Sequence, residues 1–291
     1  MDTIIGLGKA GCAIADKFAQ YSQYCAYKID VGLKRTPTTY PIKESENVED
    51  YEENCPTFGK FFKGIEGEVL FVVGGGGKIS SACLAVLKRL SNCDISILYI
   101  KPDTTFLGKQ AQMLEHMVYN VLQEYTRSGV FERMYIVANE DIENVISPVS
   151  VKNYFENVNE AIVSTVHMIN TFNHVESVTD TFSDPPVGAR ISTIGFVDPE
   201  KKEDQMFFSL DSVSDMVYYY AYNKEKLEEG STLFSEIKKS IKEKLELGVR
   251  ATYGIFETTY NQDYIYCINH SSVIQKEKNK LGGLGDLPAL P

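Results

Sequence analysis

Two glycine-rich turns, each directly after a short apolar run, constrain the fold of this chain most strongly. The first lies in TIIGLGKAGCAI, where Gly6, Gly8 and Gly11 have the G-x-G-x-x-G spacing. The second, Gly74 to Gly77, ends the run EVLFVVGGGG. Glycine permits a tight turn and lets backbone N–H groups approach phosphate oxygens at a helix N-terminus. We therefore predict that both turns lie at the carboxyl edge of one sheet, around one polyphosphate.

The apolar runs and helical patterns alternate along the first part of the chain. Strands are predicted at 3–7, 24–29, 68–73, 95–100 and 134–138, and helices at 11–21, 58–63, 80–90, 107–127, 142–146 and 151–172. This alternation predicts an α/β fold, with a doubly wound parallel sheet in a nucleotide-binding domain at residues 1–172.

The pattern changes after residue 172. A loop-like stretch at 173–189 precedes predicted strands at 190–197, 206–210, 251–257 and 263–268, with a charged helix at 233–247. These elements predict a smaller α+β domain at residues 173–275. Residues 276–291, which end in LGGLGDLPALP, are predicted to form a flexible tail.

Composition excludes several classes of protein. The net charge of the 291-residue chain is −11, which argues against a large nucleic-acid footprint because such a footprint needs a basic face. The six cysteines are scattered without a C-x-x-C pair, and no metal-binding spacing stands out. No apolar run approaches the roughly 18 residues of a membrane span, and the start lacks a basic leader segment. We expect a cytoplasmic protein without direct nucleic-acid or membrane partners.

The first turn taken alone fits a nicotinamide dinucleotide. Asp30 follows Gly11 by about 20 residues, near the position where an acidic residue would meet a ribose. A tight strand-to-helix turn without any ligand is the simpler alternative. The second turn is not a Walker A loop, since Ile79 follows Lys78. Four glycines in a row are entropically costly and are expected where a backbone passes close to another group.

Longer segments resemble a known family. After VLFVVGGGG come ISILYIKPDTTFLGKQAQMLEHMVYNVLQEY, RMYIVANEDIENVI and NYFENVNEAIVSTVHMINTF. In this order the first 175 residues or so resemble the GTPase domain of the tubulin/FtsZ superfamily. The resemblance implies that the helix at 151–172 is a central helix joining the nucleotide-binding domain to the smaller domain. It also implies GTP or GDP as the nucleotide, with Mg²⁺ as an accompanying ion. The residues that it implies at the nucleotide are Gly6, Gly8, Lys9, Gly11, Gly74, Gly75, Gly76, Gly77, Lys78, Ser80, Ser81, Asn139, Phe155 and Asn159.

Phe155 and Asn159 match the family's base-binding pattern. Their spacing places both side chains on one face of a helix. The aromatic ring could stack on guanine, and the amide could pair with the Watson–Crick edge because it offers a donor and an acceptor. The alternative is a core aromatic beside a solvent-facing amide.

The chain also departs from the family pattern. Lys78 to Ser81 replace the T-G-T-G half of the signature loop, with Lys78 and Ser80 or Ser81 as substitute donors. Leu107 and Ala111 stand where the family has a ribose-contacting glutamate and an arginine. The family's catalytic loop, N-x-D-x-x-D, reads NHVESVTD here: Asn173 matches, while Glu176 and Asp180 are displaced by one and two positions.

The resemblance implies GTP-dependent, head-to-tail assembly of this chain into filaments. Asn173, Glu176 and Asp180 would complete the active site of the next subunit, where acidic groups position the attacking water. Such a contact is not self-complementary and therefore propagates. The tail could recruit an adaptor, and the short chain suggests a prokaryotic or phage-type member. The alternatives are a non-catalytic structural relative with weak or no nucleotide binding and an NAD-binding oxidoreductase.

Overall fold

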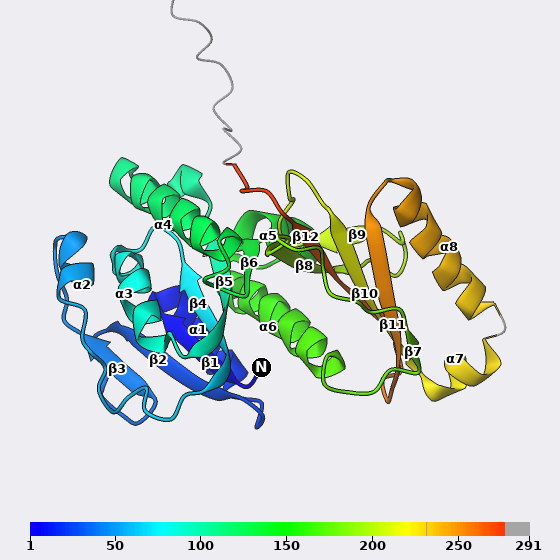
Figure 1. The fold of residues 1–291 in the computed structure, drawn as a ribbon, viewed down its shortest axis with the longest axis horizontal. Helices are drawn as coiled ribbons and strands as arrows, with labels where there is room; N and C mark the ends of the chain where they lie inside the picture. The colour runs from blue at the N-terminus through cyan, green and yellow to red at the C-terminus, as the bar shows by residue number, and fades with distance from the viewer. Residues whose placement is uncertain (231, 277–291) are drawn as a thin grey trace, which may run out of the picture.

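The computed structural model describes residues 1–230 and 232–276, whose strands form one twelve-stranded sheet (Figure 1). The strand order is β3-β2-β1-β4-β5-β6-β8-β12-β10-β11-β7, and β9 pairs with β8. The strands are β1 (Thr3–Leu7), β2 (Cys25–Val31), β3 (Thr39–Ile42), β4 (Gly67–Gly74), β5 (Cys93–Lys101), β6 (Arg133–Ala138), β7 (Thr179–Asp180), β8 (Ile191–Val197), β9 (Asp204–Met206), β10 (Asp215–Asn223), β11 (Arg250–Thr258) and β12 (Tyr264–Ser271).

Helices cover both faces of the sheet. They are α1 (Gly8–Phe18), α2 (Glu49–Glu53), α3 (Cys83–Leu87), α4 (Lys109–Arg127), α5 (Asn139–Ile146), α6 (Tyr154–Phe172), α7 (Lys224–Glu229) and α8 (Leu233–Glu246). On β4, Val69 and Phe71 belong to the core shared with α3 and α4, whereas Leu70 and Val72 belong to the core shared with α1 and α6. This alternation of buried residues on both faces confirms the doubly wound prediction.

The chain reverses its direction of sheet growth between β1 and β4. These strands are parallel neighbours, with Gly6 opposite Val72 and Leu7 opposite Val73. The chain builds outward from β1 through β2 to β3 on one side and from β4 through β5 to β6 on the other. Both glycine turns therefore start at the carboxyl edge of the sheet, at the switch point where open α/β sheets bind ligands, as predicted.

The second half is a mixed sheet with one helix layer of its own. β12 runs antiparallel to both β8 and β10, while β10 and β11 are parallel. On β10, Tyr218 and Tyr220 pack in the core under α8, and Tyr219 packs on the opposite face with Phe172 of α6. This arrangement confirms the α+β prediction for the second half.

A short ladder joins the two halves. β6 and β8 are paired at two positions, Met134 with Ile191 and Tyr135 with Ser192. α6 contacts β8 and β12 of the second half as well as α1 and α5 of the first (Figure 1). Because the sheet continues through this joint, the division into domains at residue 172 stays a prediction.

Some local predictions were wrong. The helix at 58–63 is a series of turns, because Phe58 and Gly59 have φ values of 59° and 46° that no right-handed helix accepts. The helix at 80–90 is split into a 3₁₀ segment (Lys78–Ala82), α3 and a second 3₁₀ segment (Lys88–Leu90). The strand at 206–210 is replaced by β9, and β3 was missed because Pro41 suggested a loop.

Two further points concern the limits of the fold. Within residues 1–230 and 232–276, no helix has the length and apolar character that crossing a bilayer requires. The predicted flexible tail falls, apart from Lys276, on residues 277–291, which lie outside the described residues.

We predict that Gly11→Ala lowers the free energy of unfolding by about 1–3 kcal/mol. A Cβ atom at residue 11 would lie 2.4 Å from the backbone oxygen of Val72, so α1 would have to move away from β4. Urea unfolding followed by circular dichroism measures the change. Gly77→Ala is the matched control: its Cβ meets no atom within 4 Å and its φ is −79°. Equal stabilities of the two variants would contradict the prediction.

Candidate functional site

The first glycine turn packs α1 tightly against the sheet and leaves the start of α1 open. A Cβ atom on Gly6 would lie 2.2 Å from the oxygen of Gly11, so the strand and helix backbones are almost in contact. Gly8 has a φ of +71°, and Leu7 at the N-cap supplies no side-chain hydrogen bond to α1. The first N–H groups of α1 are thus available to an anion at the switch point.

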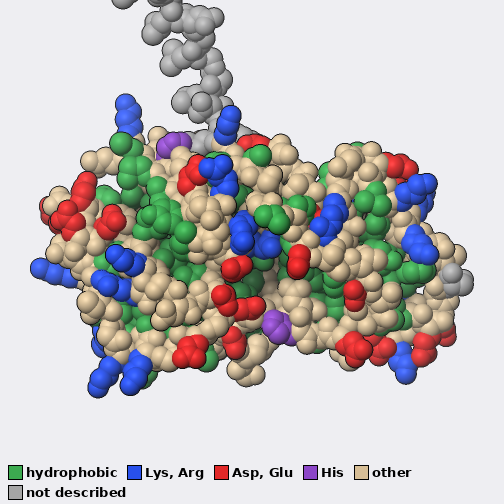
Figure 2. All heavy atoms as spheres, in the orientation of Figure 1, with side chains coloured by type: hydrophobic (Ala, Val, Ile, Leu, Met, Phe, Trp, Pro, Cys, Tyr) green, Lys and Arg blue, Asp and Glu red, His purple; other side chains and the backbone are tan. Residues whose placement is uncertain are grey.

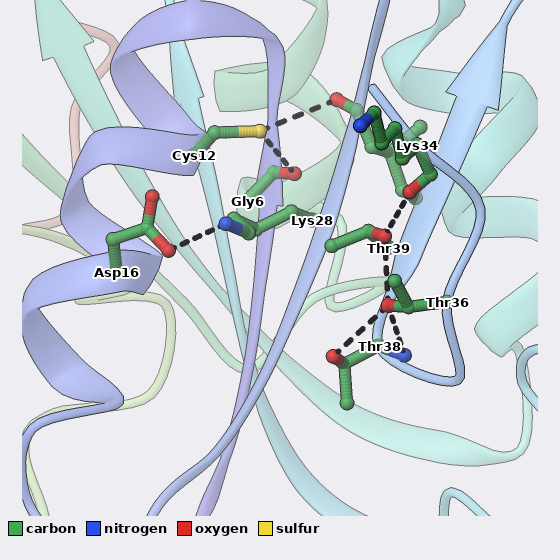
Figure 3. Close-up of polar contacts among 9 residues, drawn as sticks. Gly6, Cys12, Asp16, Lys28, Lys34, Thr36, Thr38 and Thr39 are labelled. Atoms are coloured by element: carbon green, nitrogen blue, oxygen red, sulfur yellow. Dashed lines mark hydrogen bonds and ion pairs between the residues drawn. The ribbon is translucent and has the colours of Figure 1, made fainter.

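Cys12 ties the base of this turn to two strands. Its thiol lies 3.6 Å from the backbone oxygens of both Gly6 and Ile29 (Figure 3). Burial, with a contribution from the nearby charge of Asp30, raises the pKa of the Cys12 thiol to about 12. The thiol is therefore protonated at neutral pH and acts as a packing group rather than as a nucleophile.

The second glycine turn lies directly against the first. A Cβ atom on Gly74 would lie 2.9 Å from the Cβ of Ala10, and one on Gly8 would lie 2.7 Å from a methyl group of Ile79. Gly76 has a φ of +78°, which favours glycine. The structure thus brings the two predicted loops together at one place.

A buried ion pair behind the second turn was not predicted. Lys101 contacts the fully buried carboxylate of Glu115 at 2.8 Å, and the hydroxyl of Tyr99 donates to the same carboxylate at 3.0 Å. A Cβ atom on Gly75 would lie 2.3 Å from that hydroxyl. The pair therefore fixes the floor beneath the second turn. Its sequence signal was Lys101 itself, a charge at the end of the largely apolar strand β5.

Lys78, Ser80 and Ser81 hold the second turn to neighbouring backbone. The Lys78 amino group donates to the backbone oxygen of Glu46 at 2.9 Å, and the Ser81 hydroxyl donates to that of Val48 at 2.8 Å. The Ser80 hydroxyl is buried and donates to Gly77 at 2.6 Å. These contacts fasten the loop before α2 to the glycine turn. The predicted role of Lys78, Ser80 and Ser81 as phosphate donors stays a prediction.

The predicted base-binding residues lie at the same edge of the sheet. Asn139 begins α5 directly after the carboxyl end of β6. Phe155 lies in the first turn of α6, where 69% of it is exposed and its ring contacts only the edge of Tyr154 among the ring pairs of the described chain. Asn159 is half-buried one turn later. An ion pair of 2.7 Å between Lys17 and Glu160 holds this part of α6 against α1.

Charge is also arranged around the carboxyl end of β2. Asp30 is partly buried, and this burial raises the pKa of its carboxyl group, while its hydrogen bond from the backbone N–H of Val31 and the charge of Lys9 lower it. Lys9 is exposed at the start of α1. Lys9 therefore lies within electrostatic reach of both Asp30 and the first turn.

The predicted catalytic residues lie at the opposite edge of the sheet. α6 ends at Phe172 beside the amino end of β1, where the amide of Asn170 donates to the backbone oxygen of Met1 at 2.8 Å. The 19 residues of α6 span about 28 Å. Asn173, Glu176 and Asp180 therefore cannot reach the glycine turns of their own chain.

Two of these three side chains have local structural partners. The side-chain oxygen of Asn173 accepts a hydrogen bond of 2.9 Å from the Tyr219 hydroxyl. The carboxylate of Asp180 accepts from the Ser177 hydroxyl and from the backbone N–H of Phe182. Glu176 is exposed on the rim of a cavity at this edge. Of the two displaced carboxylates, Glu176 is thus the better placed to act on a neighbouring molecule.

The cavity lies between the two halves of the chain and has a volume of about 890 Å³. Figure 2 shows a hollow near the middle of the visible face with acidic side chains and a histidine beside it. Its lining includes the acidic Glu68, Asp94, Glu132, Glu176, Asp180 and Asp184. Arg133 and His270 also line it, at the short ladder between β6 and β8.

His270 is held neutral in this cluster. It accepts hydrogen bonds at Nδ1 from Arg133 (2.6 Å) and Ser192 (2.8 Å). Burial, and then the positive charges of Arg133 and Arg250, hold the pKa of His270 well below its usual value of 6.5. Asp215, paired with Arg250 at 3.4 Å, has a carboxyl pKa that burial raises and these arginines lower in part.

Comparisons with known proteins give a consistent fold. No protein-family model and no curated protein sequence matches the chain. Among solved structures, it resembles a GTPγS-form protofilament of TubZ from Bacillus thuringiensis serovar israelensis (TM-score 0.70, 15% identity, 94% of this chain and 86% of that chain). It also resembles an FtsZ dimer from M. jannaschii (TM-score 0.66, 10% identity, 98% and 94%) and CetZ from Methanosaeta thermophila (TM-score 0.67, 13% identity, 93% and 86%).

The chain has the tubulin/FtsZ fold. This finding confirms the resemblance that the sequence motifs indicated, and it extends through the second half of the chain. In the tubulin/FtsZ fold of this chain, the two glycine turns and the start of α6 share one edge of the sheet, and the loop after α6 occupies the other. The roles of the individual residues remain predictions.

We predict that His270→Gln removes a pH-dependent part of the stability. The unfolded chain protonates His270 below about pH 6.5, whereas the folded chain does not, so stability falls as the pH falls through this range. The loss approaches about 1.4 kcal/mol per pH unit for one such histidine. Urea unfolding at pH 5.0 to 7.5 would show a steeper profile for the parent chain than for His270→Gln. Parallel profiles would contradict the prediction.

Proposed function

We propose that this chain binds GTP and assembles head-to-tail into filaments in which the active site is completed between subunits. The observation that carries the proposal is the separation of the two half-sites by the length of α6. The glycine turns lie at one edge of the sheet, and Asn173 with Glu176 lies at the other. Stacking two copies with the same orientation would bring these edges together, and each added copy would present a new pair of edges.

The residues present fit a guanine nucleotide. The uncapped start of α1 offers backbone N–H groups to phosphate oxygens, and the space beside Gly77 is open. Phe155 is exposed where a base could stack on it, and Asn159 follows one turn later with a donor and an acceptor. Within residues 1–230 and 232–276 no group of three or more acidic, histidine or cysteine side chains could hold a metal ion. A Mg²⁺ ion would therefore take its ligands mainly from phosphates and water.

The chain's own residues suggest how hydrolysis would proceed in the filament. The nucleotide held by one subunit would face Glu176 of the next. The carboxylate of Glu176 would accept a hydrogen bond from the water that attacks the γ-phosphate, orienting it in line with the bond that breaks. Asn173, fixed by Tyr219, would support the same loop.

A second candidate is a non-catalytic structural relative that binds nucleotide weakly or not at all. The contacts of Ser80 and Ser81 favour it, because both hydroxyl groups donate to backbone oxygens. Leu107 favours it too: its methyl group lies 2.8 Å from where a Cβ atom of Gly76 would be, at the position of the family's ribose contact. An NAD-dependent oxidoreductase has only the first turn and Asp30 in its favour.

We predict that GTP, but not GDP, ATP or NADH, increases 90° light scattering of the purified chain. Scattering rises when subunits polymerise, and the base contact of Asn159 distinguishes guanine from adenine. Chromatography of nucleotide released from the denatured protein identifies what the chain retains. Retained NAD would overturn the proposal, and the absence of both nucleotide and scattering would favour the structural relative.

We further predict that Glu176→Gln lowers GTP turnover at least 100-fold without weakening GTP binding, because the carboxylate acts on the neighbour's nucleotide. Asn159→Leu should weaken GTP binding at least tenfold but leave Glu176 intact. Phosphate release and fluorescent-nucleotide binding measure the two effects.

Mixing the two variants tests whether the site is shared. An Asn159→Leu subunit can supply Glu176 to GTP held by a Glu176→Gln subunit, so turnover of the mixture should exceed the sum of the separate rates. The matched control is Asp184→Asn, which also replaces a carboxylate by an amide in the lining of the cavity beside Glu176. This variant should retain parental turnover. A mixture no faster than the sum would contradict a site formed between subunits.

A further inference from the structure

The outer face of α4 carries a continuous apolar stripe. Met113, Met117, Val121 and Tyr125 follow one another at intervals of four residues, which places them on one side of the helix. Their exposed fractions are 69%, 51%, 37% and 44%. Figure 2 shows hydrophobic side chains gathered over this helix. We call these four residues the α4 stripe.

The surroundings of the α4 stripe carry few charges. Between Lys109 and Glu124 the helix has no lysine or arginine, and its single acidic residue, Glu115, is fully buried. Solvated helix faces are normally charged, and contiguous exposed apolar patches usually mark an interaction surface. The face is therefore suited to an apolar partner with little charge.

The described part of the chain ends beside this helix. Gln275 and Gln123 of α4 are fully buried and joined by two hydrogen bonds. The backbone N–H of Gln275 donates to the side-chain oxygen of Gln123 at 2.8 Å, and the side-chain amide of Gln123 donates to the backbone oxygen of Gln275 at 3.2 Å. The backbone N–H of Lys276 then donates to Asp211 at 3.0 Å. The last 15 residues, 277–291, thus start from a point fixed on α4.

The sequence of this last segment matches the α4 stripe in chemistry and in length. Leucine recurs every third residue, at 281, 284, 287 and 290, among glycine, proline and alanine, and Asp286 is the one charge after Lys280. In a polyproline II conformation every third side chain lies on the same face, and residues 281–287 span about 19 Å. The α4 stripe spans about 18 Å.

We propose that residues 281–287 dock in cis on the α4 stripe, with Leu281, Leu284 and Leu287 against it. Gln123 faces away from the stripe, so the chain must first cross the side of a helix about 10–12 Å in diameter. Half the circumference of such a helix is about 16–19 Å, and the six Cα–Cα steps from Gln275 to Leu281 reach about 20 Å when extended, which suffices for this crossing. The leucines leave water on docking, and Met113 and Met117 become covered. This inference does not depend on nucleotide binding or assembly.

The test is the rate at which hydrogen peroxide oxidises Met113 and Met117, followed by peptide mass spectrometry on the full-length chain. Docking predicts that Leu281→Ser/Leu284→Ser/Leu287→Ser raises both rates at least fivefold. Ala289→Ser, a matched change to serine outside the docking leucines, should leave them unchanged. Met168 of α6, which is 8% exposed, reports whether either variant has loosened the fold.

Dilution distinguishes the proposed occupant from a second copy of the chain. Protection by the chain's own segment is independent of protein concentration, so a tenfold dilution should leave the rates at Met113 and Met117 unchanged. Equal rates in the parent and the triple-serine variant would overturn the proposal. Protection that disappears on dilution would overturn it as well, because it would assign the α4 stripe to a neighbouring molecule.

Discussion

The near contact between the backbones of β1, α1 and β4 is the constraint on which the rest of the structure depends. Gly6 and Gly11 allow this contact, since any side chain there would meet a backbone atom within 2.4 Å. The contact lets α1 start directly at the end of β1, and it places the second glycine turn against the first. The geometry that we propose for anion binding is thus a consequence of packing in the sheet, where the same glycines allow the close contact.

The direction of α6 then decides what one chain can do alone. A helix that follows β6 and returns along the sheet must end near the amino ends of the strands. The predicted base-binding residues at its start and the predicted catalytic loop at its end are consequently separated by its full length. Under the proposed function, a single fold would carry two incomplete half-sites, and chemistry would require association. The cavity at the carboxyl end of α6 is lined by Asn173, Glu176 and Asp180 and not by the glycine turns.

Much of the first half could be predicted from the sequence because its strands are buried on both faces. Runs such as EVLFVV and ISILYI leave little alternative to central parallel strands. The edge could not be predicted in the same way: Pro41 lies in β3, and an edge strand tolerates proline because one side needs no partner. A helix was predicted at residues 58–63, but Phe58 has a left-handed conformation, and Phe58 and Phe61 instead pack around Tyr40.

The candidate site was predictable where backbone geometry dominates and less so where side chains compete for partners. Glycine spacing identified both turns. Spacing could not reveal that Ser80 and Ser81 donate to carbonyl oxygens, or that Lys101 and Glu115 form a pair beneath Gly75, because a sequence pattern does not show which partner a side chain takes. The sequence did not decide which displaced carboxylate, Glu176 or Asp180, would be the catalytic one. The hydrogen bonds of Asp180 within its own loop favour Glu176 for that predicted role.

The two-position ladder between β6 and β8 also has a mechanical meaning. A tensile load that enters at the glycine turns and leaves through the loop after α6 must pass between the halves of the chain. At the sheet it is transmitted by the pairs Met134–Ile191 and Tyr135–Ser192, beside the cavity. Elsewhere it is transmitted by the packing of α6 and by side-chain contacts such as those of Arg133 with His270 and of Gln123 with Gln275. Because so few backbone pairs cross it, we expect this seam to be compliant. In a polymer of such subunits, bending would then concentrate there, once per repeat.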